Sequence, residues 1–234
     1  DMNSIKEKCL ADLSDAWSGG VQTIVDVTTM DLGRDVLLLE DMSRQTGVHI
    51  IAATGNWLDI PRAFWNADPD KIAALYIKEI EVGIEETGIK AGIIKVANDR
   101  DGITPQGEVI LRAAARTCKA TNVPISTHTY PQGRIGEEQV RIFEDEGINL
   151  AQVYIGHSND TSDTEYLFGL LEKNVWLGLD RYPGGFLPDS LAWERRTEVA
   201  KQLIDAGFTN QIFLSHDWVA YPYGGTPHLR EQRR

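Results

Sequence analysis

The chain has 234 residues, of which 42% are hydrophobic and 25% are charged, and its formal net charge at pH 7 is −12. Its length and composition fit one large domain with a full hydrophobic core, and we predict a single domain over residues 1–234. The acidic balance argues against nucleic acid or an anionic membrane as the main partner, because both are bound through an excess of lysine and arginine. A small molecule is the expected partner.

Cellular location is indicated by the cysteines and by the apolar segments. Cys9 and Cys118 stand far apart and in no metal or redox spacing, so we expect two free thiols in a cytoplasmic protein. No apolar stretch approaches the roughly 18 residues that a membrane span needs, and no signal-peptide pattern opens the sequence. The sequence begins at Asp1 rather than at a methionine, which suggests that residues upstream are missing.

One unit recurs along the chain after an opening helical segment, Ile5 to Trp17: a short apolar run, a loop, and a segment with helical periodicity. The apolarity of the runs is continuous rather than alternating, which is typical of strands buried on both faces. The predicted strands are Val21 to Val27, Val48 to Thr54, Ala91 to Val96, Val123 to His128, Ala151 to His157, Val175 to Asp180 and Gln211 to Asp217.

Two of the intervening helices carry clear start signals. Asp68 and Thr104 are predicted N-caps, and Pro69 and Pro105 follow them at the first helical positions. The first of these helices is expected to bury one face, formed by Ile72, Leu75, Tyr76 and Ile80.

Alternating strands and helices predict an α/β fold with a parallel sheet, either an open doubly wound sheet or a closed (β/α)8 TIM barrel. Seven strands, with no glycine-rich phosphate fingerprint after the first, favour the barrel with its first strand absent from this chain. Since the sequence opens with a helix, we expect the absent strand to lie before Asp1.

Polar residues close the predicted strands, at the edge where barrels of this kind place their chemistry. They are Asp26, Thr54, Lys95, His128, His157, Asp180 and Asp217. A single strand-end histidine or aspartate usually hydrogen-bonds to a nearby loop. Four of them from four different strands, Lys95, His128, His157 and Asp217, would converge on one barrel mouth and together predict a metal site.

The ligand types suit Zn²⁺, Mn²⁺ or Co²⁺, with room for an activated water. Lys95 is the exception, because an ammonium is no ligand. A desolvated neutral amine can add CO2 and become a carbamate, which is a carboxylate able to bridge two cations. The alternative is that Lys95 only extends its charge from the strand end into water.

Four motifs, "GIIKVA", "VPISTHT", "YIGHSNDT" and "IFLSHDW", resemble in order and spacing the phosphotriesterase family of the amidohydrolase superfamily, which includes phosphotriesterase-like lactonases. The segments "GVQTIVDVTTMDLGRDV" and "IIAATGNWLDIPR" resemble it too, so the likeness runs from about Gly20 to Trp218. The resemblance implies a (β/α)8 barrel and two divalent metal ions, usually zinc, with manganese, cobalt or iron as alternatives. It also implies a homodimer.

Carried over by position, the resemblance assigns a role to each strand-end residue. Lys95 corresponds to the carbamylated bridging lysine, and His128 and His157 to the ligands of the more exposed metal. Asp217 corresponds to the ligand of the buried metal, which also takes the proton when a hydroxide of the binuclear centre attacks the substrate. Asp160 would be the second acidic member of this relay, and a helix N-cap is its alternative role.

The sequence departs from the family at its two ends. The family's His-x-His pair on the first strand has no counterpart among the five histidines, and the chain stops at "HLREQRR", where the family continues into further helix. Either this is part of a complete enzyme, or the polypeptide lacks half of one metal site. We favour the first explanation, because the interior motifs are intact.

Substrate choice is expected from the loops. Trp57 resembles a pocket-wall aromatic of the family, with a core tryptophan as its alternative role, and Arg181 and Tyr182 resemble the seventh-strand loop of the lactonase branch. We therefore predict a hydrolase that opens lactones, with phosphotriester hydrolysis as a side activity. The alternatives are a phosphotriesterase (aryldialkylphosphatase) proper, a related hydrolase of amides or carbamates, and a non-catalytic binding barrel.

Overall fold

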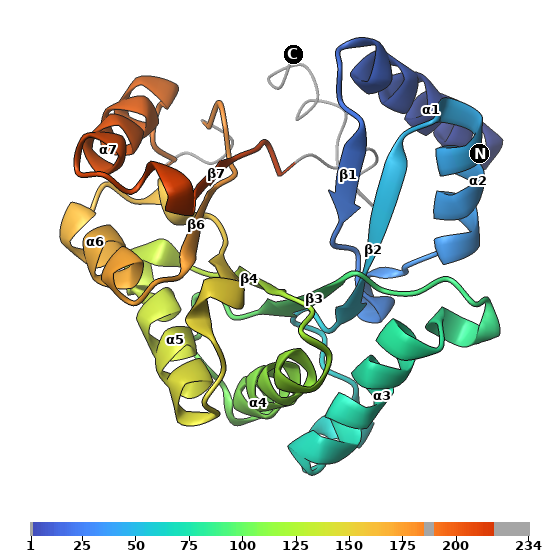
Figure 1. Ribbon diagram of the computed structural model, residues 1–234, viewed down its shortest axis with the longest axis horizontal. Helices are drawn as coiled ribbons and strands as arrows, with labels where there is room; N and C mark the ends of the chain where they lie inside the picture. The colour runs from blue at the N-terminus through green and yellow to red at the C-terminus, as the bar shows by residue number, and fades with distance from the viewer. Residues whose placement is uncertain (1, 185–189, 218–234) are drawn as a thin grey trace.

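A computed structural model describes residues 2–184 and 190–217, which form a curled parallel sheet surrounded by helices (Figure 1). Seven strands pair in chain order, and every pair is parallel. The strands are β1 (Thr23–Asp26), β2 (His49–Gly55), β3 (Ile93–Ala97), β4 (Ile125–His128), β5 (Val153–Ile155), β6 (Trp176–Leu179) and β7 (Ile212–Leu214). Each lies within, or within one residue of, one predicted run.

Seven helices pack on the outer side of the curled sheet (Figure 1). They are α1 (Met2–Ser18), α2 (Val36–Thr46), α3 (Pro69–Glu81), α4 (Pro105–Thr121), α5 (Ile135–Asp145), α6 (Thr164–Glu172) and α7 (Trp193–Asp205). This arrangement confirms the predicted α/β barrel fold with seven of its strands. Within the described ranges, β1 and β7 are the two edges of the sheet.

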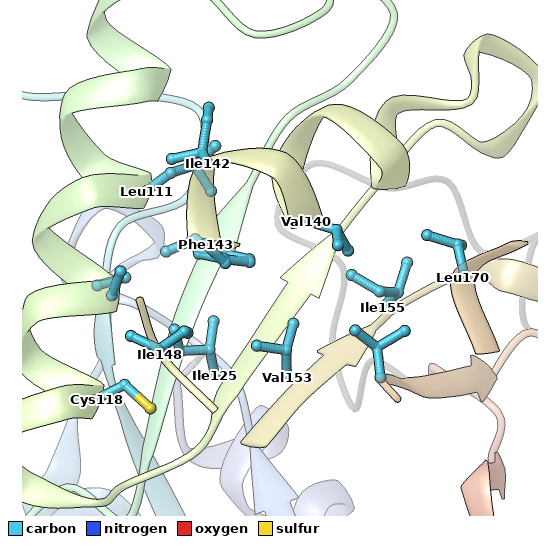
Figure 2. Close-up of a cluster of buried hydrophobic side chains, with 14 of the residues drawn as sticks. Leu111, Cys118, Ile125, Val140, Ile142, Phe143, Ile148, Val153, Ile155 and Leu170 are labelled. Atoms are coloured by element: carbon cyan, nitrogen blue, oxygen red, sulfur yellow. The ribbon is translucent and has the colours of Figure 1, made fainter. Parts of the chain in front are cut away.

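The main core lies between the sheet and the helices. Its members come from strands β3 to β6 and from helices α3 to α7, and almost all are fully buried. Figure 2 shows part of this core, with Leu111, Ile125, Phe143 and Val153 among its labelled side chains. Burial on both faces explains the continuous apolarity of the central strands. The edge strands differ, because Val25, Phe213 and Leu214 are exposed by 46%, 49% and 67%.

The predicted helix starts are confirmed. The Asp68 side chain accepts a hydrogen bond from the Asp70 N–H, and the Thr104 side chain accepts one from the Gly107 N–H.

The predicted buried face of α3 is right except for one residue. Ile72 and Tyr76 are buried, and Ile80 is partly buried against the core, but Leu75 is 49% exposed. Leu75 precedes Tyr76 by one residue, or about 100° around the helix, and this rotation carries its side chain off the buried stripe.

Both cysteines are buried free thiols, as predicted. No helix in the part of the chain that the structure describes has the length and apolarity to cross a membrane.

A buried ion pair ties the β1–α2 loop to its neighbours. Arg34, with 1% of its side chain exposed, donates two hydrogen bonds of 2.7 and 2.8 Å to the Glu79 carboxylate on α3. It donates a third, of 2.7 Å, to the Ala53 carbonyl on β2. One guanidinium therefore joins three successive elements of the barrel wall.

Arg34→Met should lower the free energy of unfolding by about 3 kcal/mol, because it leaves the carboxylate of Glu79 without its partner in a largely buried setting. Chemical denaturation measures the change. Arg44→Met is the matched control, since Arg44 makes an exposed pair with Glu40 on α2 and should change stability little. Equal effects of the two substitutions would contradict the role given to Arg34.

Candidate active site

Three of the predicted strand-end residues, Lys95, His128 and His157, lie around Trp57. Lys95 on β3, His128 at the end of β4 and His157 just after β5 are 5%, 5% and 4% exposed. The Lys95 Nζ lies 5.7 Å from the centre of the Trp57 ring. Trp57 packs edge-on against His128 at 4.4 Å between ring centres, and His128 packs in the same way against His157 at 4.5 Å.

Lys95 does not extend into water, because it is buried in the middle of β3. Burial lowers the pKa of its ammonium from 10.5 to about 8, although the charges of Asp180 and Asp217 act in the opposite direction. The alternative interpretation of a lysine that reaches solvent is therefore wrong. A buried amine with this pKa has an appreciable neutral fraction near neutral pH, which is the form that can react with CO2.

His128 is held without any hydrogen bond to its ring. Both ring nitrogens are buried and have no hydrogen-bond partner among the described residues, and the Asp99 Oδ2 lies 3.6 Å from Nε2. Burial, followed by the charges of His157 and Lys95, lowers the pKa of His128 far below its usual value. Its neutral imidazole keeps a free lone pair, as a metal ligand requires.

His157 is oriented by Asp180, the residue that follows β6. Its backbone N–H donates to Asp180 Oδ1 at 2.9 Å, and its Nδ1 lies 3.0 Å from the same oxygen. The Tyr154 hydroxyl donates to Asp180 Oδ2 at 2.8 Å. Burial alone would raise the pKa of Asp180, but His157 and the hydrogen bonds outweigh it and lower that pKa. A carboxylate on Nδ1 favours the tautomer whose Nε2 can bind a metal.

Asp217 and Asp160 are linked by Arg181 rather than by a direct contact. The Arg181 Nε donates to Asp217 Oδ2 at 3.2 Å, and its Nη1 donates to Asp160 Oδ2 at 2.6 Å. The same Asp217 oxygen lies 4.0 Å from His157 Nδ1. A guanidinium does not give up its proton in a protein, so Arg181 separates the two carboxylates electrostatically while it fixes their positions.

The alternative role of Asp160 as a helix N-cap is wrong. Asp163 caps α6 by accepting from the Tyr166 N–H, whereas Asp160 ends a 3-10 turn, Ser158–Asp160. The Asp160 carboxylate is occupied by Arg181 and by Arg196 of α7.

Tyr182 lies beside the core. It is partly buried against the main hydrophobic cluster, its N–H donates to the Ser215 carbonyl, and its own carbonyl lies 3.1 Å from His216 Nδ1. Residues 185–189 of the same loop, and Trp218 of the last motif, lie outside the described residues.

Sequence reasoning missed two contributors to the site. It recorded Asp180 only as a strand-end residue, and it did not consider Arg196. A signal for Arg196 was present, because it takes a place on the buried face of α7 with Val199, Ala200 and Leu203. A charged residue in an apolar stripe indicates a specific buried partner.

The residues fit part of a metal centre. Two buried imidazoles, a buried lysine and a nearby carboxylate have the chemistry of divalent-cation ligands once the lysine is a carbamate. Within residues 2–184 and 190–217, no three His, Cys, Asp or Glu side chains come together in a metal-binding group. The capacity of this site therefore depends on Lys95.

Comparison with known proteins agrees with this geometry. The model of the phosphotriesterase family matches residues 3–231. The chain belongs to the phosphotriesterase family.

Several curated proteins of the phosphotriesterase family are similar to the chain. It is 40% identical over 205 residues to an aryldialkylphosphatase of Saccharolobus solfataricus, covering 87% of this chain and 64% of the relative. It is 36% identical to a phosphotriesterase homology protein of Mycobacterium tuberculosis, covering 91% and 67%. It is 29% identical to an N-acetyltaurine hydrolase of Dictyostelium discoideum, covering 85% and 56%. The chain thus spans about two thirds or less of the length of these relatives.

The neutral burial of His128 predicts a pH dependence of stability. In the unfolded chain its pKa is about 6.5, and in the folded protein it is far lower, so below pH 6.5 the unfolded state binds one more proton. His128 should therefore cost stability as pH falls below 6.5, by up to about 1.4 kcal/mol for each pH unit.

Urea unfolding of metal-free protein between pH 7.5 and 5.5 measures this slope. His128→Asn should flatten it, whereas His49→Asn, a substitution of an exposed histidine on β2, should leave it unchanged. The same slope in all three proteins would contradict the neutral burial of His128.

Proposed function

We propose that this protein is a metal-dependent hydrolase that opens lactones, with phosphotriester hydrolysis as a side activity. One observation carries the proposal. A buried lysine on β3, buried histidines at the end of β4 and just after β5, and a carboxylate beyond β7 lie near one another beside the ring of Trp57.

In this proposal Lys95, His128, His157 and Asp217 hold two divalent cations, zinc being the first candidate, with Lys95 as its carbamate. Cations held there would supply Lewis acidity toward the substrate and would activate water. Asp217 accepts the proton of that water. Asp180 holds the His157 ring in the orientation that leaves Nε2 for ligation.

Asp160 supports Asp217 through Arg181 in this scheme, because Arg181 contacts both carboxylates. Asp160 therefore influences the position of the Asp217 carboxylate and the electrostatic field around it. The role of second acid that was predicted for Asp160 would be exerted through the guanidinium of Arg181.

The choice of substrate rests on the two walls of the site. Trp57 offers an apolar face beside His128, suited to an acyl chain or an aryl leaving group. On the other wall Arg181 presents a guanidinium, which can bind the carbonyl or carboxylate oxygens of a lactone and its product. Tyr182 completes that wall in the proposal.

Two relatives support alternative substrates. The similarity to an aryldialkylphosphatase favours phosphotriesters, and the similarity to an N-acetyltaurine hydrolase favours N-acyl amides. The three substrate classes share attack of an activated water on a carbonyl or phosphoryl centre, so the same site could serve each of them.

Lys95→Ala should lose bound metal and hydrolytic activity together, because it removes the amine that would become the bridging carbamate. Metal content is measured by inductively coupled plasma mass spectrometry on the full-length protein, and added short carboxylic acids such as acetate should restore part of both. Lys90→Ala, a substitution of an exposed lysine before β3, is the matched control. Full metal content in the Lys95 variant would refute the carbamate.

A substrate panel tests the ranking. The full-length protein is assayed on an N-acyl homoserine lactone, a p-nitrophenyl phosphotriester and an N-acetyl amide, and the lactone should give the highest kcat/KM. A chelator should abolish turnover, because the cations activate the water. A higher value for either other substrate selects that alternative, and binding without turnover that survives the chelator would make this a non-catalytic barrel.

A further inference from the structure

We infer that Arg196 is a positioning residue of this site, which fixes Arg181 and, through it, the carboxylate of Asp217. The inference rests on the proposed function for its catalytic consequence. Its structural basis is a continuous set of hydrogen bonds from the outer helix α7 to Asp217, which follows β7.

Arg196 is a fully buried arginine, with 0% of its side chain exposed, and its donors are well used. Its Nε donates to the Leu191 carbonyl at 2.8 Å, and its Nη1 donates to the Asn159 carbonyl at 2.7 Å. Its Nη2 donates to Asp160 Oδ1 at 2.7 Å and to Ser190 Oγ at 2.9 Å. A buried guanidinium is tolerated only with such partners, so the loops around it are tied to its position.

Two separate routes lead from Arg196 to Arg181. In the first, the Asp160 carboxylate bridges the two arginines, with Oδ1 bound to Arg196 and Oδ2 bound to Arg181. In the second, the backbone carbonyl of Asn159 binds Arg196, while its side-chain Oδ1 accepts from the Arg181 N–H at 3.2 Å. Both the guanidinium and the backbone of Arg181 are thereby fixed relative to α7.

The packing around Arg196 is close at Gly184. Gly184 approaches it so closely that a Cβ at this position would lie 2.2 Å from the Arg196 Nε and 2.5 Å from the Leu191 carbonyl oxygen. Gly184 also has a φ of +86°, which favours glycine. Gly184 and Leu191 thus lie directly against the guanidinium.

The consequence for catalysis comes from the last of these contacts, between Arg181 and Asp217. Arg181 donates to the same Asp217 oxygen that lies 4.0 Å from His157. Without Arg196, Asp160 would lose one of its two guanidinium partners and would be free to move. Arg181, which is bound to Asp160, could then move with it and away from Asp217. A displacement of about 1 Å at a reacting group can cost about 100-fold in rate.

The test is a double-mutant cycle in the full-length protein, measured on the best substrate of the panel. Arg196→Met should lower kcat/KM by about 10- to 100-fold, which is the usual effect of losing an outer positioning contact. In an Arg181→Met background the same substitution should cost less than about 3-fold, because its path to Asp217 is already broken. Arg195→Met, at an exposed arginine on the same helix, is the matched control and should have no effect.

A purely structural role predicts something different, namely an equal loss with and without Arg181. That result, or wild-type kcat/KM in Arg196→Met, would overturn the inference. If Arg196→Met does not fold, Arg196→Lys replaces it, since it keeps the charge but cannot reach all four acceptors at once.

The role of Arg196 can also be tested if the proposed function is wrong. If the wild-type protein turns over no substrate of the panel, the proposed function fails, and the same cycle is read from urea midpoints. The contact path would be supported if the double variant shifts the urea midpoint by less than the sum of the shifts of Arg196→Met and Arg181→Met alone. Additive shifts would overturn it.

Discussion

The site depends on one geometric constraint, the parallel alignment of short strands. Because neighbouring strands run the same way and pair in chain order, all of their carboxyl ends meet at one end of the barrel. The register of β3 with β4 pairs Ala97 with His128 and so sets Lys95 near the histidine. Asp217, far along the chain, reaches the same place after β7. Each chemical group is thus delivered by a separate, rigidly packed element.

Burial then decides the state of each group. Arg196 and Arg181 are charged and are compensated by Asp160, and Asp180 is compensated by His157 and Tyr154. Lys95 has only an aromatic face beside its ammonium among the described contacts. Desolvation outweighs the opposing charges of Asp180 and Asp217 and lowers the pKa of Lys95 to about 8.

Periodicity and strand-end position predicted the fold and the meeting of the main residues, because both follow from backbone geometry that the sequence pattern records directly. The contacts of Asp180 and Arg196 were not predictable in this way. They join loops and a helix whose relative positions are set by packing, and either residue could have bound several partners. The same limit explains why the N-cap role considered for Asp160 was wrong. Asp163, three residues later, was an equally suitable cap for α6 and is the one that the structure uses. The prediction that Leu75 is buried failed for a smaller reason. Two faces of α3 near Ile72 carry apolar residues, and the periodicity did not show which of them packs against the core.

The two walls of the site are held by different parts of the barrel. The Trp57 N–H donates to both carboxylate oxygens of Asp31, at 3.0 Å each, and the preceding Asn56 accepts from the Tyr76 hydroxyl at 2.6 Å. Trp57 is therefore positioned from the β1–α2 loop and from α3, whereas Arg181 is positioned from α7. Neither support passes through Lys95 or His128. Substitutions in the support of one wall can consequently alter the fit of a leaving group or of an acyl oxygen there while the support of the other wall stays in place. This gives a physical basis for relatives of one family that carry the names of an aryldialkylphosphatase and an N-acetyltaurine hydrolase.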